Sequence, residues 1–105
     1  MNRVDYEERR KVYEQAININ GLETQIHKAI EEMSELTKEL CKSFYPNGTT
    51  LDKIADEIAD VTIMMEQMRL AFDLNDLVCE HMDSKVERLK DRLEKSKQEA
   101  AGRES

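Results

Sequence analysis

The sequence predicts an all-α protein of four helices that pack in a bundle-like arrangement, and three observations support this fold class. Aromatic residues make up 5% of the 105 residues. The chain has only 3 Gly and 1 Pro, so it is poor in the residue types that favour strands and turns. Apolar residues recur at spacings of three and four along most of the chain, which is the period of one face of a helix.

The first helix is expected to begin after Asp5, whose side chain can cap it. Glu7 and Glu8 then fall in the first turn, where negative charge is favourable. Asn20 and Gly21 are residue types typical of a helix C-terminus. We therefore expect this helix to end there.

The second helix is expected from about Leu22 to Phe44, because its apolar residues form a stripe that would face a core. The stripe consists of Ile26, Ala29, Ile30, Met33, Leu36, Leu40 and Phe44. Residues 45–48 contain Pro and Asn-Gly, which favour a turn. Thr49 and Asp52 then have the spacing of a capping box for the next helix.

The third helix is expected from about Thr50 to Phe72. Between Val61 and Met65 it carries apolar residues on nearly every side, a pattern typical of a helix that is buried on most sides. One short chain hardly supplies that many neighbours. The sequence therefore predicts a homo-oligomer whose assembly completes the helical fold.

The fourth helix should follow a break at residues 73–75 and carry an apolar stripe at three-and-four spacing. The stripe consists of Val78, Met82, Val86, Leu89 and Leu93. No such stripe continues after Glu94. We therefore expect a single helical domain over residues 1–94 and a polar tail, frayed or disordered, over residues 95–105.

Composition narrows the function classes. The formal net charge of −7 argues against binding to a nucleic-acid backbone, which needs clustered Lys and Arg. It leaves nucleotides open, because metal ions can bridge carboxylates and phosphates. No apolar run approaches the roughly 20 residues of a membrane span. Residues 1–7 contain no apolar segment of the kind found in secretion signals, so we expect that they are not one. The two isolated cysteines suit a reducing compartment, so we expect a cytoplasmic protein.

Two acidic motifs stand out. The first, residues 31–35, reads E-E-x-x-E, and the second, residues 57–60, reads E-x-x-D. In each motif two carboxylates stand at i and i+3 on a helix, so both project from one face. They are Glu32 and Glu35 in the first motif, and Glu57 and Asp60 in the second.

The two motifs are expected to meet when the second and third helices fold back on each other. Around a turn near Asn47, the two acidic pairs fall within about 3 Å of the same height, at about 1.5 Å of rise per residue. The same reasoning at the turn near Leu74 places Lys85 and Arg88 level with the acids. Two cations on the fourth helix would therefore flank the acidic cluster.

Carboxylates gathered in this way repel one another, and a divalent cation removes the conflict. Because the candidate ligands are all oxygens, with no convergent Cys or His, the pattern favours a hard ion such as Mg²⁺. The sequence thus predicts a Mg²⁺ site that cleaves a nucleoside triphosphate. The alternative is an ordinary solvated helix face, with Lys28 and Lys38 as salt-bridge partners of the acids.

At these motifs the chain resembles the MazG-type nucleoside triphosphate pyrophosphohydrolases, whose signature is E-E-x-x-E followed by E-x-x-D. The resemblance spans about Leu22 to Leu93 and is closest to the short, single-domain type. It implies cleavage of an NTP or dNTP between the α and β phosphates, giving a monophosphate and pyrophosphate. It also implies a homodimer or homotetramer.

The resemblance also assigns residue roles. It implies Glu32, Glu35, Glu57 and Asp60 as ligands of one or more Mg²⁺ ions, for which Mn²⁺ can substitute. Glu31 and Glu35 would be the catalytic acids; Glu31 is either a further ligand or a residue that orients the attacking water. Lys85 and Arg88 would contact substrate phosphates. Several members carry Asn where this chain has Asp83.

Two further hypotheses remain open. The chain could be a non-catalytic helical interaction or regulatory module on the same fold, which loss of a motif acid would favour; all the motif acids are present. It could instead be a related pyrophosphatase that acts on another nucleotide, such as phosphoribosyl-ATP. No separate organic cofactor is expected in any of these cases.

Overall fold

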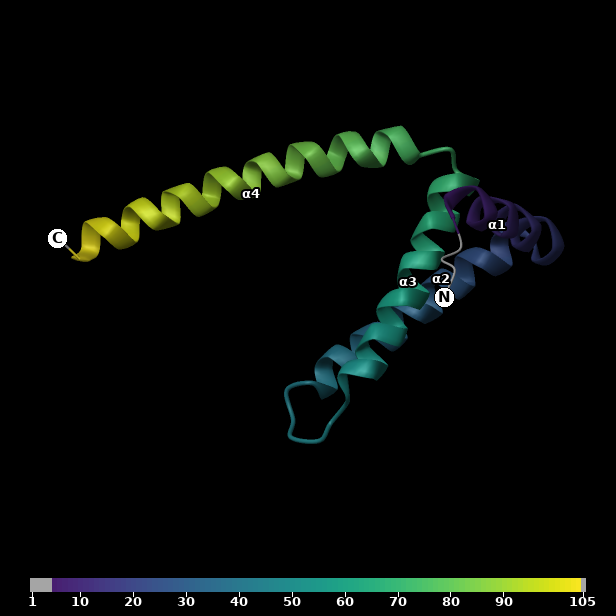
Figure 1. Ribbon diagram of the computed structural model, residues 1–105, viewed down its shortest axis with the longest axis horizontal. Coiled ribbons are helices and arrows are strands. Elements are labelled where there is room, and N and C mark those ends of the chain that lie inside the picture. The colour runs from purple at the N-terminus through teal and green to yellow at the C-terminus, as the bar shows by residue number, and fades with distance from the viewer. Residues whose placement is uncertain (1–4, 105) are drawn as a thin grey trace. The chain divides into compact units, whose positions relative to one another are not determined.

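The computed structural model describes residues 5–104; residues 1–4 and Ser105 lie outside the described part. The described residues form four helices and no strand: α1 (Tyr6–Asn20), α2 (Leu22–Lys42), α3 (Leu51–Ala71) and α4 (Asn75–Glu104) (Figure 1). The all-α prediction is therefore confirmed for this part of the chain. None of its helices is long and apolar enough to cross a membrane.

The chain divides into two compact units, residues 1–73 and residues 74–105. The first unit contains α1, α2 and α3, which pack on one another, with the most extensive packing between α2 and α3. The second unit is the single helix α4. The division falls at the expected break, where Asp73 adopts a left-handed backbone with φ of 52°.

Side-chain caps define where α1 and α3 begin. Asp5 accepts a hydrogen bond from the Glu8 backbone N–H at 2.8 Å, as expected. At α3, however, the expected capping residue is wrong by one position. Thr50, not Thr49, accepts from the Lys53 backbone N–H at 3.2 Å. The Thr49 hydroxyl instead donates to Glu39 Oε1 at 2.9 Å. Thr49 therefore binds α2 and does not cap α3.

The facing sides of α2 and α3 form a seam that is mostly polar. We use "α2–α3 seam" for the facing positions Gln25, Ala29, Glu32, Leu36 and Glu39 of α2 and Glu57, Asp60, Met64 and Gln67 of α3. Each of these positions is buried or half-buried, and their alternating spacings of three and four match one helix face. Charged and amide groups thus occupy the positions that apolar residues usually fill between two helices.

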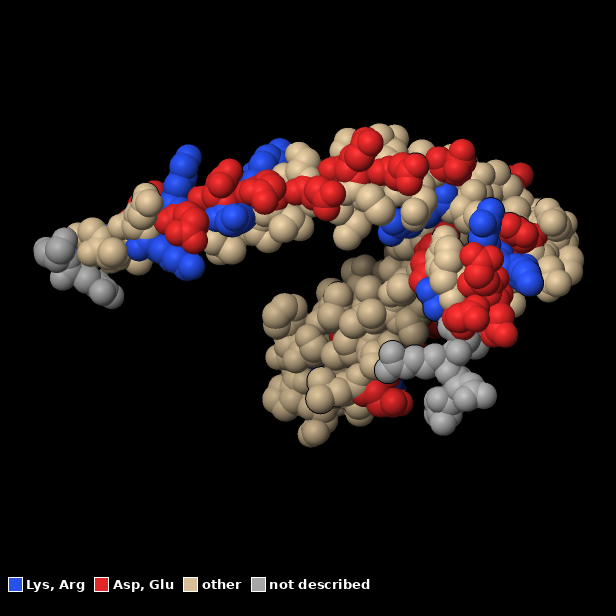
Figure 2. Space-filling view, turned by 45° about the horizontal axis from the view of Figure 1, so that its top comes forward, with Lys and Arg blue, Asp and Glu red and all other residues tan. Residues whose placement is uncertain are grey.

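The expected core-facing stripe of α2 is wrong in most of its members. Ala29 is buried and Ile26 and Leu36 are half-buried, whereas Ile30 is 54% exposed and Phe44 85% exposed. Met33 and Leu40 are exposed as well. The stripe overlaps the seam only in part. Its residues lie about one position later in the sequence than the seam residues, which rotates the apolar face by about 100° around the helix. Figure 2 shows few charged side chains on the face of the α2–α3 pair turned to the viewer.

On α3 the segment from Val61 to Met65 was expected to be buried on most sides. Only Met64 is buried in the structure, while Thr62 and Ile63 are exposed. The chain by itself therefore leaves much apolar surface of the first unit in contact with solvent. Among the described residues of that unit, the buried apolar side chains are Tyr13, Ala29 and Met64.

A polar bridge fastens α1 to α3. The Tyr13 side chain is 5% exposed, and its hydroxyl donates to Glu66 Oε2 at 2.6 Å. The same oxygen accepts from Arg9 Nε at 3.2 Å. Hydrogen bonds to an ionised group are stronger than neutral ones. Burial and the Glu66 carboxylate together raise the pKa of Tyr13 to about 12, so the hydroxyl stays protonated and keeps donating.

The expected end of the fourth helix differs from the structure. α4 continues past Glu94 to Glu104, through the segment expected to fray. The reason lies in its composition, because Lys, Gln, Glu and Ala all favour helix, and Lys97 pairs with Glu94 at 3.5 Å. The stripe residues Met82, Val86, Leu89 and Leu93 are exposed, since a single helix cannot cover its own apolar face.

Gly48 is the position in the α2–α3 connection that tolerates no side chain. Its backbone N–H donates to the Tyr45 carbonyl at 3.0 Å, and a Cβ added there would collide with the Lys42 carbonyl oxygen. Its neighbour Asn47 has φ of 59°, a left-handed conformation that Asn tolerates. This tight connection fixes how far α2 and α3 are shifted along each other, and with it the register of the seam.

We expect Gly48→Ala to lower the free energy of unfolding by about 1–3 kcal/mol, the usual cost of forcing extra atoms into a packed site. Asn47→Gly is the matched control and should stay within about 0.5 kcal/mol of wild type, because Gly adopts positive φ without strain. Chemical denaturation followed by circular dichroism measures both. Equal stability of Gly48→Ala and wild type would contradict this account of the turn.

Candidate metal centre

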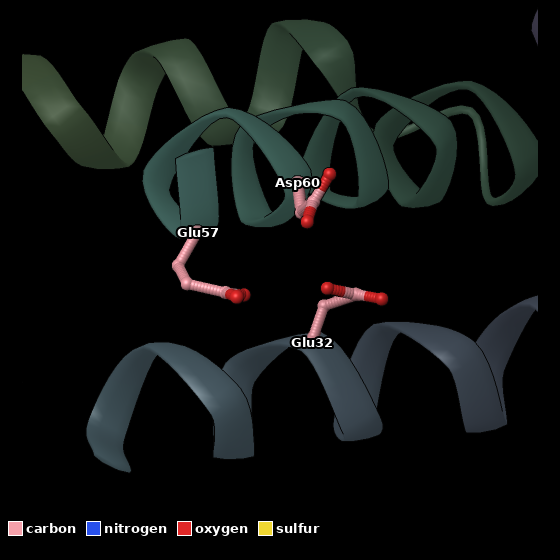
Figure 3. Close-up of side chains that lie close together, drawn as sticks. All are labelled: Glu32, Glu57 and Asp60. Atoms are coloured by element: carbon pink, nitrogen blue, oxygen red, sulfur yellow. The ribbon is translucent and has the colours of Figure 1, made fainter. Parts of the chain in front are cut away.

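Three carboxylates converge in the middle of the α2–α3 seam. Glu32 projects from α2, and Glu57 and Asp60 project from α3 towards it (Figure 3). One oxygen from each residue can be chosen so that all three lie within 4.8 Å of one another. Residues 25 positions apart in the sequence are thus brought to one point, as the antiparallel hairpin predicts.

The cluster is partly withdrawn from solvent. All three side chains are half-buried. Glu57 Oε2 is fully buried and has no hydrogen-bond partner among the described residues. A buried polar atom without a partner is rare in folded proteins and costs free energy, so this oxygen is available to a ligand that the chain itself does not supply.

Burial and mutual repulsion disfavour the charged forms of two of these acids. Burial is the main cause of the raised pKa of Glu32, and the negative charges of Asp60 and Glu57 add to it. Burial likewise raises the pKa of Glu57, and the charge of Asp60 contributes most among its neighbours. Within the described part of the chain, no positive group is among the causes that act on either carboxylate. A bound cation would supply that compensation.

Glu39, one further acid in the seam, provides a comparison within the same structure. It is 7% exposed, yet its pKa is lowered, chiefly because Thr49 donates a hydrogen bond to it and Lys42 lies 3.3 Å away. The chain therefore neutralises this carboxylate with its own groups. No described residue plays this part for Glu32 or Glu57, where the named causes all raise the pKa.

The remaining acids expected at the site take peripheral positions. Glu31 and Glu35 are exposed and fall outside the group of three. Each still affects the cluster through its charge: the charge of Glu31 raises the pKa of Glu32, and that of Glu35 raises the pKa of Glu57. Of the four acids expected as ligands, the structure thus gathers three and leaves Glu35 at the edge.

The expected phosphate contacts, Lys85 and Arg88, lie on α4 in the second unit. Both are exposed and stand one turn apart on the helix. Their role towards phosphates stays a prediction. Asp83, where several members of the resembled family carry Asn, is exposed on the same helix.

Sequence reasoning gave little weight to the amides that continue the seam beyond the acids. Gln25 and Gln67 are 2% and 6% exposed, and Gln25 Nε2 donates to Gln67 Oε1 at 2.7 Å. Their spacing could have revealed them. Gln25 lies seven residues before Glu32 and Gln67 seven after Asp60, which is two helical turns in each case and returns to the same face.

The residues present fit a hard divalent cation. The donors are carboxylate oxygens alone, which Mg²⁺ and Mn²⁺ prefer over the N and S ligands that select zinc or copper. Three carboxylates leave coordination positions for water and phosphate. Comparisons with protein-family models, curated proteins and solved structures gave no match to this chain. The geometry of the seam is therefore the basis for interpreting its function.

We expect the metal-free protein to lose stability across the pH window that begins at about 4.5, the ordinary pKa of a Glu carboxyl, and extends up through the raised pKa values of Glu32 and Glu57, as far as these two groups determine it. A carboxyl whose pKa is higher in the folded state binds protons more tightly there, so stability falls while that proton is lost. The Glu32→Gln/Glu57→Gln double variant should lack this loss. Its advantage over wild type in unfolding free energy should therefore grow across the window.

Urea denaturation in EDTA at several pH values measures the difference. Glu23→Gln is the control, because it removes a carboxylate from the exposed side of the same helix and should follow the wild-type pH dependence. Glu39, whose pKa is lowered, opposes the trend equally in all three proteins. Parallel curves for wild type and the double variant would show that the seam carboxylates do not repel as described.

Proposed function

We propose that this chain is a Mg²⁺-dependent nucleoside triphosphate pyrophosphohydrolase of the MazG-like type. It cleaves an NTP or dNTP between the α and β phosphates and releases a nucleoside monophosphate and pyrophosphate. The observation that carries this proposal is the convergence of Glu32, Glu57 and Asp60, with a buried, unpartnered oxygen on Glu57. A hydrophobic seam would stabilise the helix pair better, so the acids point to a role beyond folding.

In this proposal Glu32, Glu57 and Asp60 hold the metal, and Glu35 completes the ligand set from the edge of the cluster. A bound Mg²⁺ would neutralise charge on the phosphates and would make a nearby water more acidic. The half-buried position of the carboxylates limits competing water and strengthens their interaction with the cation. The packing of α2 against α3 holds them in place.

Proton transfer from the attacking water needs a base beside the metal ligands. Glu31 and Glu35 are the candidates, because both are exposed, lie on α2 next to the cluster and already interact with its charges. A base must lie within hydrogen-bond reach of the proton it accepts. Lys85 and Arg88 are proposed to contact phosphates from α4, as cations that balance the charge of the substrate.

The proposal includes a homodimer or homotetramer in the cytoplasm. Large apolar side chains on α2 and α3, such as Ile30 and Ile58, are about half exposed. Exposed apolar surface of this kind marks association surfaces. A second copy would cover it and complete the core that one chain lacks. Cys41 and Cys79 are exposed and form no disulfide within the described residues, which suits a reducing compartment.

The same exposed apolar residues favour the second candidate, a non-catalytic helical module that binds a partner protein. That function needs the outer faces of the helices and makes no use of the seam. It therefore offers no reason for three carboxylates at the centre of the helix pair. The two candidates make different predictions for the acids. The enzyme needs them for activity, whereas in the interaction module they would only lower the stability of the fold.

We expect wild-type protein with Mg²⁺ to release pyrophosphate and a monophosphate from at least one member of a panel of NTPs and dNTPs. Loss of groups that merely support a metal ligand costs about 10–100-fold. Removing a ligand itself in Glu57→Gln or Asp60→Asn should therefore reduce kcat/KM by at least that much. Chromatography of the nucleotide products identifies the bond that is cleaved.

Glu23→Gln serves as the control and should retain wild-type kcat/KM, because its side chain is exposed on the opposite side of α2 from the seam. Turnover by Glu57→Gln and Asp60→Asn at the wild-type rate would contradict the proposed site. Absence of turnover for every nucleotide would favour the interaction module.

We expect wild-type protein to sediment as a dimer or tetramer. Ile30→Lys and Ile58→Lys together should shift it towards the monomer, because two charges would then have to be buried at the interface. Sedimentation velocity at several concentrations measures the distribution. A monomeric wild type would contradict the proposed assembly.

A further inference from the structure

A pocket of about 240 Å³ opens beside the carboxylate cluster, within the first unit. Glu32 and Asp60 line one end of it, and the amides of Asn20, Gln25 and Gln67 line the rest together with Lys28. Ile63 and Met64 add apolar wall. Pockets for drug-sized ligands measure about 300–1,000 Å³, so this one suits a part of a nucleotide and not the whole molecule.

The three amides form a hydrogen-bonded chain with a direction. Asn20 Nδ2 donates to Gln25 Oε1 at 3.2 Å, and Gln25 Nε2 donates to Gln67 Oε1 at 2.7 Å. The chain therefore ends at the amide nitrogen of Gln67, which donates to no described residue. Gln67 is 6% exposed and lines the pocket. Although the residue is nearly buried, its amide nitrogen is not among the buried unpartnered atoms of the described residues, so it is open to the pocket and can donate to an acceptor atom of a molecule bound there.

The distance from the amides to the acids suits a nucleotide. Gln67 lies seven residues after Asp60 and Gln25 seven before Glu32, which is about 10.5 Å along each helix. In a nucleotide the base and the phosphates occupy opposite ends of the sugar. With phosphates at the carboxylate end, the base falls at the amide end. Lys28, four residues before Glu32, lies between the two ends.

We propose that this pocket binds the nucleobase of the substrate and that the amide nitrogen of Gln67 donates to a ring carbonyl of that base. The proposal rests on the proposed function and makes Gln67 a specificity-determining residue. Uracil, thymine, cytosine, guanine and hypoxanthine carry a ring carbonyl, whereas adenine carries none. Nucleotides of the carbonyl-bearing bases are therefore the preferred substrates, and adenine nucleotides are the poorest.

The sharpest test compares inosine and adenosine triphosphates, which differ only at one edge of the purine: hypoxanthine has a carbonyl and a ring N–H where adenine has an amino group and a bare ring nitrogen. Calorimetry with their α,β-methylene analogues in Mg²⁺ measures affinity without cleavage. The inosine analogue should bind at least about tenfold more tightly, since a site built to hydrogen-bond a ligand group rejects the analogue that lacks it.

Two variants test the role of Gln67. Gln67→Glu keeps an acceptor for Gln25 but replaces the free donor with an acceptor, so the adenosine analogue should now bind more tightly than the inosine analogue. Gln67→Met has a similar length and no polar amide, so the two analogues should bind about equally. Gln15→Glu, which adds the same charge at an exposed position of α1, should keep the wild-type preference.

Equal binding of both analogues by wild type, no binding of either, or a wild-type preference in Gln67→Met would overturn the assignment of the pocket. Pyrophosphate release from unmodified ITP and ATP separates this proposal from the proposed reaction. Equal release from both would support the proposed reaction and contradict the proposed base pocket. Discrimination between the analogues without any release would support the base pocket and contradict the reaction.

Discussion

The packing of α2 against α3 depends on the electrostatic repulsion among three carboxylates that lie between the two helices. Helix pairs are usually held by apolar residues at facing positions. Here Glu32, Glu57 and Asp60 take those positions, and Gln25 and Gln67 follow them two turns away. A short hydrogen bond joins the two amides, whereas the carboxylates repel one another and leave one buried oxygen without a hydrogen-bond partner among the described residues. A cation at the centre would convert this repulsion into an attraction between the two helices.

The polar groups in the seam determine where the apolar residues of the first unit lie. Because the inner positions carry polar groups, many large apolar residues of α2 and α3 lie on other faces and are exposed. Additional support comes from polar contacts at the two ends of the hairpin, where Tyr13 binds Glu66 and Thr49 binds Glu39. The stability of the first unit therefore depends on few buried side chains. In the proposed function a bound cation and a second copy of the chain would each add stabilising contacts.

The sequence was sufficient for the number of helices and for the meeting of the two acidic motifs, because both follow from helical spacing and a short turn. It misidentified the buried face of α2, since Ile30 and Met33 have the period of a core stripe while the true seam lies about one residue earlier, at Ala29 and Glu32. Periodicity cannot select between neighbouring faces when one is apolar and the other functional. It also could not anticipate that the Gln67 amide would end a hydrogen-bonded chain, because that depends on side-chain conformation.

The most direct test of the account is a calorimetric titration of Mg²⁺ into the metal-free protein, with wild type, Glu57→Gln and Glu23→Gln compared at neutral pH. Binding at the α2–α3 seam predicts saturable uptake by wild type and Glu23→Gln, and an affinity at least about tenfold lower in Glu57→Gln, since a ligand is lost. The same titration would contradict the account if wild type showed no saturable binding, or if all three proteins bound the ion equally.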